Sequence, residues 1–450
     1  MGRYFGTDGI RDRADGAKLA PQFVRRVGSA LGRYLAERGE RRIPVVALGR
    51  DPRPSGARIL QDLHAGLGRH TEAVYDLGMV PTPAVSRAVL RLEANLGIVI
   101  TASHNPASDN GIKLFGADGA KLSEAEEAEI EAHIESEPEL PADAVPAAPL
   151  HTFNALGHYV GWASALLHQG SFAGMRAVID TANGGMREAA PRILQHLGLE
   201  FTQIGDACDG AQINSGVGSE HPESLVEAMR RTGTPLGLAF DGDGDRLVVV
   251  GSDGQPVAGE ALLALLAVDR AAHDRLPGQQ MVTTIHSNLG LDHFLKQHGI
   301  TTHRSAVGDR AVAALMRETG ASFGGESSGH LVIADRAPTG DGLLSAIEVL
   351  HFLQRAGRPI EELAAQVGLF PQATENIPAP VKPPLEQLQQ LAQVQQKWET
   401  QLGDQGRLLL RYSGTEPRLR LLVEAPDLPT AQTCCQELAA AATADLEAAQ

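Results

Sequence analysis

The apolar and polar positions of the chain repeat one pattern three times. In each copy an apolar run predicts a strand, a helix follows, a second apolar run and a second helix come next, and a third apolar run ends in a polar motif. In the first copy the strand segments are Ile43–Gly56, Glu72–Val85 and Leu96–Pro106, and the helices are near Ala57–Gly68 and Ser86–Glu93.

The second and third copies follow the same order. In the second copy the strand segments are Arg176–Gly185, Glu200–Asp206 and Leu236–Arg246, and the helices are Arg187 to about His196 and Pro222–Arg231. In the third copy the strand segments are Met281–Asn288, Ile300–Asp309 and Ala321–His330, and the helices are near Leu291–His298 and Arg310–Glu318. All three polar motifs stand where the third strand ends, which is the edge where open α/β sheets bind ligands.

After each polar motif a further apolar run and a glycine turn predict a hairpin at the edge of the sheet. These runs are Ile112–Gly119, Leu247–Gly254 and Leu331–Gly340. A segment rich in proline, alanine and acidic residues, Ile134–Leu150, is typical of a linker.

Beyond about Leu369 the pattern changes to a Gln-rich helix (Leu385 to about Leu402), two strands flanking RYSGTEPR, and an Ala-rich last helix. The sequence thus predicts an α/β protein with three similar mixed α/β domains around a central cleft and a smaller C-terminal α+β domain. The predicted domains are residues 1–150, 151–256, 257–368 and 369–450.

Composition narrows the choice of partners. The formal net charge of −16 over 450 residues disfavours nucleic acid and anionic lipid, so an anionic ligand needs a local cluster of arginines. No run approaches the roughly 20 apolar residues of a membrane span. The first residues lack the apolar core of a secretory signal, and three cysteines form no disulfide or metal framework. We therefore expect a cytoplasmic protein.

The motif DGDGDR places Asp241, Asp243 and Asp245 at alternate positions with glycines between them. In a loop these carboxylates can turn toward one point and supply the hard oxygen ligands that Mg²⁺ prefers. An EF-hand is excluded because its sixth and twelfth positions hold Arg246 and Ser252. A solvated acidic turn is the plain alternative, but the loop interrupts two apolar runs, which favours a metal site.

The motif RYSGTEPRLR joins arginines, hydroxyls and a glycine in one predicted hairpin turn. Backbone N–H groups, Ser413 and Thr415 can donate to a phosphate that Arg411 and Arg418 neutralise. A charged hairpin tip is the alternative.

Three weaker signals remain. Gly325–His330 places Glu326, Ser328 and His330 on one loop, where a carboxylate and a hydroxyl suit the hydroxyls of a sugar. Phe5–Arg11 offers Arg11 in a glycine turn. Ser103 and His104 suggest a hydrolase, but TASHNP is no G-x-S-x-G elbow, and adjacent side chains tend to point apart. A serine facing a metal held by carboxylates suggests phosphoryl transfer, with Ser103 carrying the phosphate.

Together the motifs TASHNP, DGDGDR, GESSGH and RYSGTEPR, in this order beside a threefold α/β repeat, resemble the α-D-phosphohexomutase superfamily. The segments RYFGTDGIR, SHNPASDNGIKLF, VGSEHPESL and SAVGDR are most similar to its bacterial phosphoglucosamine mutase branch. The resemblance implies a four-domain cytoplasmic isomerase, an intramolecular phosphotransferase, that interconverts glucosamine 6-phosphate and glucosamine 1-phosphate. Its product would lead toward UDP-N-acetylglucosamine.

The resemblance also implies roles for individual residues. Ser103 would be the phosphoserine, and Asp241, Asp243 and Asp245 with its phosphate would hold one Mg²⁺ per subunit. Lys113, Arg246, Arg11 and His330 would act at the transferring group, and Glu326 and Ser328 would hold sugar hydroxyls. The loop Arg411, Ser413, Gly414, Thr415 and Arg418 would grip the other phosphate, and a bisphosphate sugar would be both intermediate and primer.

Two departures from the family pattern concern packing. Ala107 and Ala311 stand where an aromatic residue often follows the SHNP and VGDR motifs. Two alternatives stay open on the sequence: a phosphomannomutase or phosphoglucomutase on the same scaffold, and a non-catalytic sugar-phosphate-binding protein. We expect a small-molecule partner, with a monomer or a homodimer as the assembly.

Overall fold

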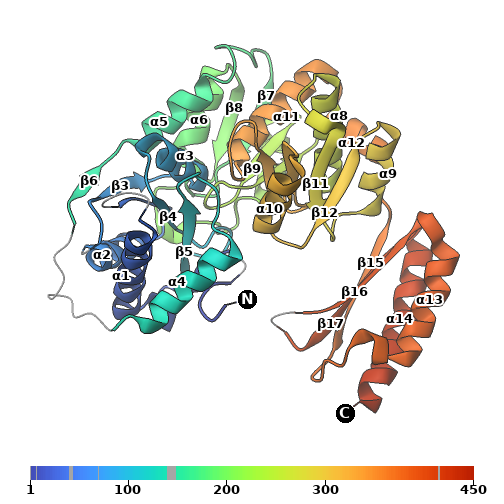
Figure 1. Cartoon of the computed structure of the whole chain (residues 1–450). Helices are drawn as coiled ribbons and strands as arrows, with labels where there is room; N and C mark the ends of the chain where they lie inside the picture. The colour runs from blue at the N-terminus through green and yellow to red at the C-terminus, as the bar shows by residue number, and fades with distance from the viewer. Residues whose placement is uncertain are drawn as a thin grey trace. The chain divides into compact units, whose positions relative to one another are not determined.

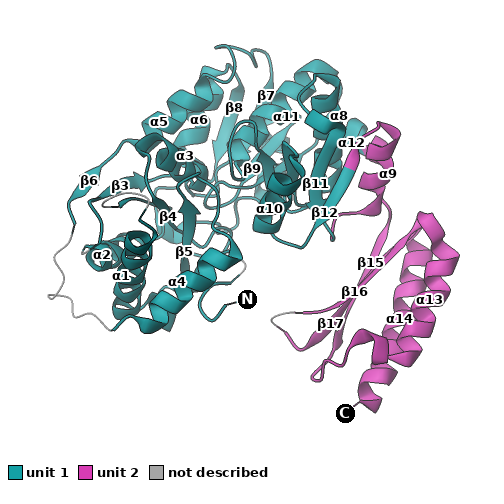
Figure 2. Cartoon of the chain, in the orientation of Figure 1, with its two compact units in different colours: residues 1–285, 302–364 teal, residues 286–301, 365–450 magenta. Residues whose placement is uncertain are grey.

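The computed structural model describes residues 2–6, 8–39, 44–68, 70–138, 148–413 and 416–449. It divides into two compact units, each considered by itself below (Figure 2). The first unit comprises residues 1–285 and 302–364, and the second comprises residues 286–301 and 365–450. The strands of the described residues form three mixed sheets and one three-stranded antiparallel sheet (Figure 1). The predicted fold class is therefore confirmed.

The first sheet has the strand order β1-β5-β4-β2-β3-β6. Its strands are β1 (Ile10–Arg13), β2 (Val45–Arg50), β3 (Ala73–Met79), β4 (Leu96–Ile100), β5 (Asp109–Gly116) and β6 (Leu150–Thr152). The accompanying helices are α1 (Pro21–Arg38), α2 (Gly56–Leu67), α3 (Thr82–Leu92) and α4 (Glu124–Ser136). The apolar run of β4 is buried at all five positions, as expected for a central strand whose two faces are both covered.

The second sheet has the order β10-β9-β7-β8, and the third has the order β12-β11-β13-β14. Their strands are β7 (Arg176–Asp180), β8 (Glu200–Ile204), β9 (Gly237–Phe240), β10 (Leu247–Val250), β11 (Gln280–Thr284), β12 (Thr301–Ser305), β13 (Phe323–Gly325) and β14 (Leu331–Ile333). The associated helices are α5 (Ala155–Ser164), α6 (Met186–His196), α7 (Pro222–Thr232), α8 (Gly259–Ala272), α10 (Asp309–Thr319), α11 (Gly342–Ala356) and α12 (Ile360–Ala364). Four strands of the first sheet, β5-β4-β2-β3, repeat the order of the second and third sheets, so the predicted threefold repeat is present.

Two local predictions were wrong, and both errors have a physical cause. The hairpin strand β5 is not at the edge of its sheet, because β1 pairs with it in antiparallel register from Ile10 opposite Ile112. The strand segment predicted to reach Val85 ends at Met79, and α3 starts at Thr82 rather than near Ser86. Pro81 and Pro83 lack the N–H that a strand needs and suit a helix start. The hairpin strands β10 and β14 do lie at sheet edges.

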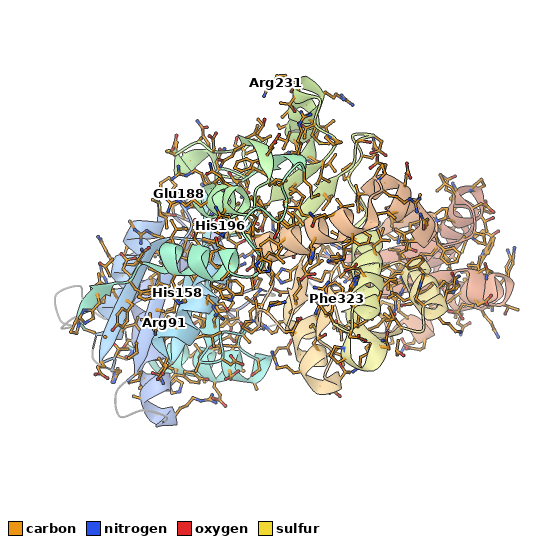
Figure 3. The ribbon with its side chains drawn as sticks, turned by 90° about the horizontal axis from the view of Figure 1, so that it is seen from above. Arg91, His158, Glu188, His196, Arg231 and Phe323 are labelled. Atoms are coloured by element: carbon orange, nitrogen blue, oxygen red, sulfur yellow. The ribbon has the colours of Figure 1, made fainter. Side chains whose placement is uncertain are left out.

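Helix α5 leads from the first repeat into the second and packs against α3. The labelled side chains of Arg91 on α3 and His158 on α5 lie close together (Figure 3), and burial with Arg87 and Arg91 nearby lowers the pKa of His158. Figure 3 also labels Phe323, which is fully buried at the start of β13. The predicted linker begins within α4 and ends at β6, and its residues 139–147 lie outside the described residues.

The second unit is a three-stranded antiparallel sheet with the order β15-β17-β16, covered by two helices. Its elements are α9 (Leu289–Gln297), β15 (Gln372–Pro378), α13 (Gln389–Leu402), β16 (Arg407–Tyr412), β17 (Arg418–Glu424) and α14 (Leu428–Ala448). Strands β16 and β17 form the predicted hairpin around RYSGTEPR. The helices α13 and α14 and one face of the sheet share an apolar core that includes Trp398, Leu419 and Leu438.

Candidate active site

Ser103 lies three residues beyond the end of β4 at Ile100 and is almost fully buried. Its backbone has a φ of +52°, in the left-handed region that few residues other than glycine adopt. Three hydrogen bonds hold that conformation: Ser103 N donates to Thr101 Oγ1 at 2.9 Å, and Ser103 O accepts from Arg53 Nη2 at 2.9 Å and Asn214 Nδ2 at 2.8 Å. The segment after the strand therefore carries a serine whose backbone is held by three hydrogen bonds.

The side chain of Ser103 reaches the acidic loop that follows β9. Ser103 Oγ donates to Asp241 Oδ2 at 2.6 Å, so two of the predicted motifs meet. His104 Nδ1 lies only 3.4 Å from Ser103 Oγ, so the expectation that these neighbours point apart was wrong.

The three aspartates Asp241, Asp243 and Asp245 are all buried, and each brings an oxygen within 4.8 Å of the other two. Asp241 Oδ1 accepts from the backbone N–H groups of Gly244 (3.0 Å) and Arg246 (3.2 Å), which curls the loop around the carboxylate. Burial and the neighbouring Asp245 and Asp243 carboxylates hold the pKa of Asp241 well above its usual value. The loop thus concentrates negative charge that a cation would relieve.

One oxygen each of Asp243 and Asp245 is buried without a hydrogen-bond partner. Buried polar atoms are normally paired, so unpaired carboxylate oxygens in a cluster of hard donors fit a divalent cation. The residues present therefore suit the metal site that the sequence predicts.

Lys113, on β5, balances part of this charge. Its buried Nζ contacts Asp243 Oδ2 at 2.8 Å, Asp245 Oδ2 at 3.3 Å and Asp8 Oδ2 at 2.9 Å. Although burial acts in the opposite direction, these carboxylates hold the pKa of Lys113 well above its usual value. The lysine is therefore a permanent cation beside the acidic loop, as its predicted place at the transferring group requires.

A second group of charges continues from Asp8 to His330. Lys121 Nζ contacts both Asp8 and Asp309, and Asp309 Oδ2 lies 3.2 Å from His330 Nε2. His330 Nδ1 lies 3.7 Å from Asp245 Oδ1. Burial lowers the pKa of His330, but Asp309 and Asp245 outweigh it and raise the pKa. His330 was a predicted site residue, whereas Asp8, Lys121 and Asp309 were missed.

The two remaining predicted cations also lie in this region. Arg11 donates to Asp8 Oδ2 at 2.5 Å, and Asp8 also contacts Lys113. Arg246 follows the last aspartate, with its Nε 3.9 Å from Asp245 Oδ1. The nearby carboxylates, Asp245 first, raise the pKa of Arg246 despite burial. The structure thus brings Ser103, Lys113, Arg246, Arg11 and His330 into one charged cluster of the first unit.

The predicted sugar loop follows β13. Glu326 Oε1 accepts from the backbone N–H of Gly308 at 2.9 Å, while Ser328 is exposed. Gly329 N donates to Glu326 O at 3.2 Å, which closes the tight turn that leads to His330. The loop therefore presents one half-buried carboxylate and one exposed hydroxyl.

In the second unit, Arg411 and Arg420 stand directly opposite each other on β16 and β17. With His286, Thr374 and Asn376 they line a cavity of about 230 Å³ on the sheet face. Burial and the adjacent Arg420 lower the pKa of Arg411. Arg420 contacts the Glu416 carboxylate at 2.8 Å, whereas no carboxylate pairs with Arg411 among the described residues. The charge of Arg411 is therefore open to an anion in this cavity.

The predicted phosphate loop is only partly described. Gly414 and Thr415 lie outside the described residues. Ser413 is buried, and its Oγ accepts from Glu416 N at 3.2 Å. Arg418 is exposed and does not line the cavity, whereas Arg420 does. Sequence reasoning passed over Arg420, although its alternation with the buried Leu419 and Leu421 places it on the open face of the sheet.

Comparison with known proteins shows the family of the chain. The chain matches the four models of the phosphoglucomutase/phosphomannomutase family: alpha/beta/alpha domain I over residues 2–141, domain II over 162–254, domain III over 258–369 and the C-terminal domain over 376–441. The chain belongs to this family.

Within this family, the chain is similar over nearly its whole length to proteins named phosphoglucosamine mutase. The phosphoglucosamine mutase of Halorhodospira halophila is 41% identical over 94% of this chain and 93% of that protein. The phosphoglucosamine mutase of Paracoccus denitrificans is 41% identical over 98% of both chains. A solved phosphoglucomutase/phosphomannomutase family protein from Burkholderia thailandensis superposes with a TM-score of 0.82 at 25% identity, covering 98% of this chain and 97% of that one. The resemblance to phosphoglucosamine mutases is confirmed.

Proposed function

We propose that this protein is an isomerase that interconverts glucosamine 6-phosphate and glucosamine 1-phosphate. The observation that carries the proposal is the 2.6 Å hydrogen bond from Ser103 Oγ to Asp241, where two corresponding strand ends of the repeat meet. The chain is 41% identical over nearly its whole length to proteins named phosphoglucosamine mutase. A serine hydroxyl beside carboxylates that can hold a divalent cation suits phosphoryl transfer, because the cation stabilises charge on the transferred group.

The proposed reaction has two transfers that balance. Phosphorylated Ser103 first gives its phosphoryl group to the O1 hydroxyl of glucosamine 6-phosphate: the bond from phosphorus to Ser103 Oγ breaks, and a bond to O1 forms. The proton of O1 goes to a base of the site, and Ser103 Oγ regains a proton. The bisphosphate sugar then turns over. In the second transfer the bond from phosphorus to O6 breaks and a bond to Ser103 Oγ forms, while the Oγ proton goes to a base of the site and O6 gains a proton, which leaves glucosamine 1-phosphate and the phosphoserine.

The carboxylates Asp241, Asp243 and Asp245, together with the Ser103 phosphate, would hold one Mg²⁺. The oxygens of Asp243 and Asp245 that have no hydrogen-bond partner, and the crowding of the three carboxylates, support this assignment. When bound, the cation would neutralise charge on the group in transfer. Lys113 and Arg246 would place fixed positive charge beside the same group, and Arg11 and His330 would complete the cluster through Asp8 and Asp309.

The sugar and its second phosphate would be held by the other two motifs. We assign the sugar hydroxyls to Glu326 and Ser328. We assign the non-reacting phosphate to Arg411, Ser413, Gly414, Thr415 and Arg418, and add Arg420 because it lines the cavity with Arg411. Arg411 has no carboxylate partner among the described residues, whereas Arg420 also contacts Glu416 at 2.8 Å, so a dianionic phosphate in the cavity would be neutralised first by Arg411.

The partners follow from the substrate. The proposed partner is a small sugar phosphate, the assembly a monomer or homodimer, and the location the cytoplasm, where the product would lead toward UDP-N-acetylglucosamine. Among the helices of the described residues, none has both the length and the apolar character needed to cross a membrane.

The test is a substrate panel on the phosphorylated protein with Mg²⁺ and glucose 1,6-bisphosphate as primer. We expect kcat/KM for glucosamine 6-phosphate to exceed that for glucose and mannose 6-phosphates. Preference for glucose or mannose phosphates would reassign the protein to another branch of the family. Absence of turnover on all three, with phosphate present on Ser103, would reduce it to a sugar-phosphate-binding protein.

A further inference from the structure

The loop between β12 and α10, residues 306–308, touches the proposed sugar loop and runs directly into the first two residues of α10, Asp309 and Arg310. Gly308 N donates to Glu326 Oε1 at 2.9 Å. Gly308 has a φ of +115°, which side-chain-bearing residues rarely adopt, so the direction of this N–H depends on how the loop is held. Whatever fixes the loop therefore also fixes the Glu326 carboxylate.

The two residues after Gly308 are both held by the N-terminal part of the chain. Asp309 contacts Lys121, and Arg310 forms a two-pronged ion pair with Glu127 on α4. In that pair Arg310 Nη1 lies 2.7 Å from Glu127 Oε2 and Nη2 lies 2.5 Å from Oε1. The side chains are only 14% and 10% exposed, so water screens the pair little.

Apolar packing does not hold this loop on one side. Val307, Gly308 and Arg310 line a cavity of about 580 Å³, and Glu127 lines the same cavity. Val307 is 42% exposed. On the side that faces the cavity, this segment is positioned by hydrogen bonds and ion pairs, and one of these is the pair of Arg310 with Glu127.

Burial of the Glu127 carboxyl opposes the charged form that the ion pair needs. Burial, with some help from Asp8 and Glu131, raises the pKa of Glu127 to about 7, although Arg310 acts in the opposite direction. Buried ion pairs often contribute less stability than neutral replacements and serve to fix a geometry. This pair has the properties of a contact that positions the loop.

We propose that Arg310 and Glu127 are a positioning pair that holds Gly308 N against Glu326 and so sets the affinity for the sugar. The inference rests on the proposed function, because it requires Glu326 to contact the substrate. Neither residue touches the reacting atoms in this role. The N-terminal helix α4 thereby contributes to sugar binding through a loop that follows a strand of the third sheet.

The first test is Glu127→Gln, which keeps the size and an acceptor oxygen but removes the charge. We expect KM for glucosamine 6-phosphate to rise about tenfold, as for one weakened contact of about 1.4 kcal/mol, with kcat within about twofold of wild type. The matched control is Glu348→Gln, because Glu348 is another buried carboxylate paired with an arginine: Arg275 Nη1 contacts its two oxygens at 3.1 and 2.9 Å, and the pair lies away from the Gly308 loop. An equal KM rise in the control would overturn the proposal.

The second test is a double-mutant cycle with Glu326→Gln. If the pair acts through Glu326, the variant carrying both Glu127→Gln and Glu326→Gln should have the KM of Glu326→Gln alone. Additive losses would refute the positioning role while leaving the proposed function intact. A wild-type KM in Glu326→Gln would instead remove Glu326 from the site and the inference with it. Should Glu127→Gln fail to fold, Arg310→Lys serves in both tests.

Discussion

Arg411 and Arg420 face each other across the β16–β17 ladder, and His286 lies in the same cavity. Like charges in directly opposed positions destabilise a sheet. Glu416 offsets the charge of Arg420 at 2.8 Å, but Arg411 has no such partner among the described residues, and an anion in the cavity would compensate it. The pair identifies where in the second unit a phosphate would bind. Arg418, which the sequence favoured, is exposed and outside this cavity.

We therefore predict that Arg420→Ala lowers kcat/KM for both glucosamine phosphates by roughly one to two powers of ten, the value of a lost charge-assisted contact. Arg418→Ala is the matched control and should cost less than Arg420→Ala. Both variants are assayed in the forward and reverse directions with added glucose 1,6-bisphosphate. A larger loss of kcat/KM in Arg418→Ala than in Arg420→Ala would show that the phosphate binds at the hairpin tip and not in the cavity.

Ser103→Ala should abolish turnover and leave the fold intact. The change removes one hydroxyl that donates to Asp241, while the backbone contacts of residue 103 to Arg53 and Asn214 stay available. Intact-mass measurement should find one phosphoryl group on wild-type protein and none on the variant. Turnover at the wild-type rate would refute the phosphoserine.

Asp241→Asn should remove the stabilisation that Mg²⁺ gives. In wild-type protein, Mg²⁺ at 100 times its Kd should add about 2.7 kcal/mol to the free energy of unfolding, visible as a rise in Tm. The variant should show little rise, since one of three anionic ligands is lost. Asp253→Asn, in the exposed turn after β10, is the control and should keep the full rise. An unchanged Mg²⁺ response in Asp241→Asn would make the acidic loop a charged turn only.

The Glu127 carboxyl should make stability depend on pH. Its pKa is about 7 in the folded protein and near 4.5 in an unfolded chain, so the folded state binds the proton more tightly. Its stabilising effect is complete below about pH 4.5 and is lost as pH rises to about 7, by up to about 3 kcal/mol. Denaturant unfolding from pH 4.5 to 8 should show a shallower fall in Glu127→Gln than in wild type. Parallel curves would mean that Glu127 has an ordinary pKa.

The sequence predicted the parts of the site that lie at strand ends. The apolar run of β4 and the alternating acids after β9 were visible as local patterns, and the repeat indicated that the strand ends carrying Ser103 and Asp241 would point at one shared cleft. Asp8, Lys121 and Asp309 carry no such signal, because their importance comes from contacts between segments far apart in the chain.

Two further features needed the register of paired strands. Arg420 is one of several arginines near a turn, and only its position opposite Arg411 singles it out. The place of β5 within its sheet depends on β1, a four-residue strand with no distinctive pattern. Helices α1 and α4 were not assigned from the sequence either, although the Ser123–Glu126 capping box at the start of α4 is a local signal that was available.

The fixed backbone of Ser103 has a consequence for how the proposed cycle must run. Its carbonyl is tied to Arg53 and Asn214 and its N–H to Thr101, in a conformation that few side-chain-bearing residues adopt. The serine therefore stays in one place while two chemically different ends of a sugar must reach it in turn. In the proposed cycle the bisphosphate sugar would therefore have to rotate by half a turn within the site, while Ser103 keeps its position.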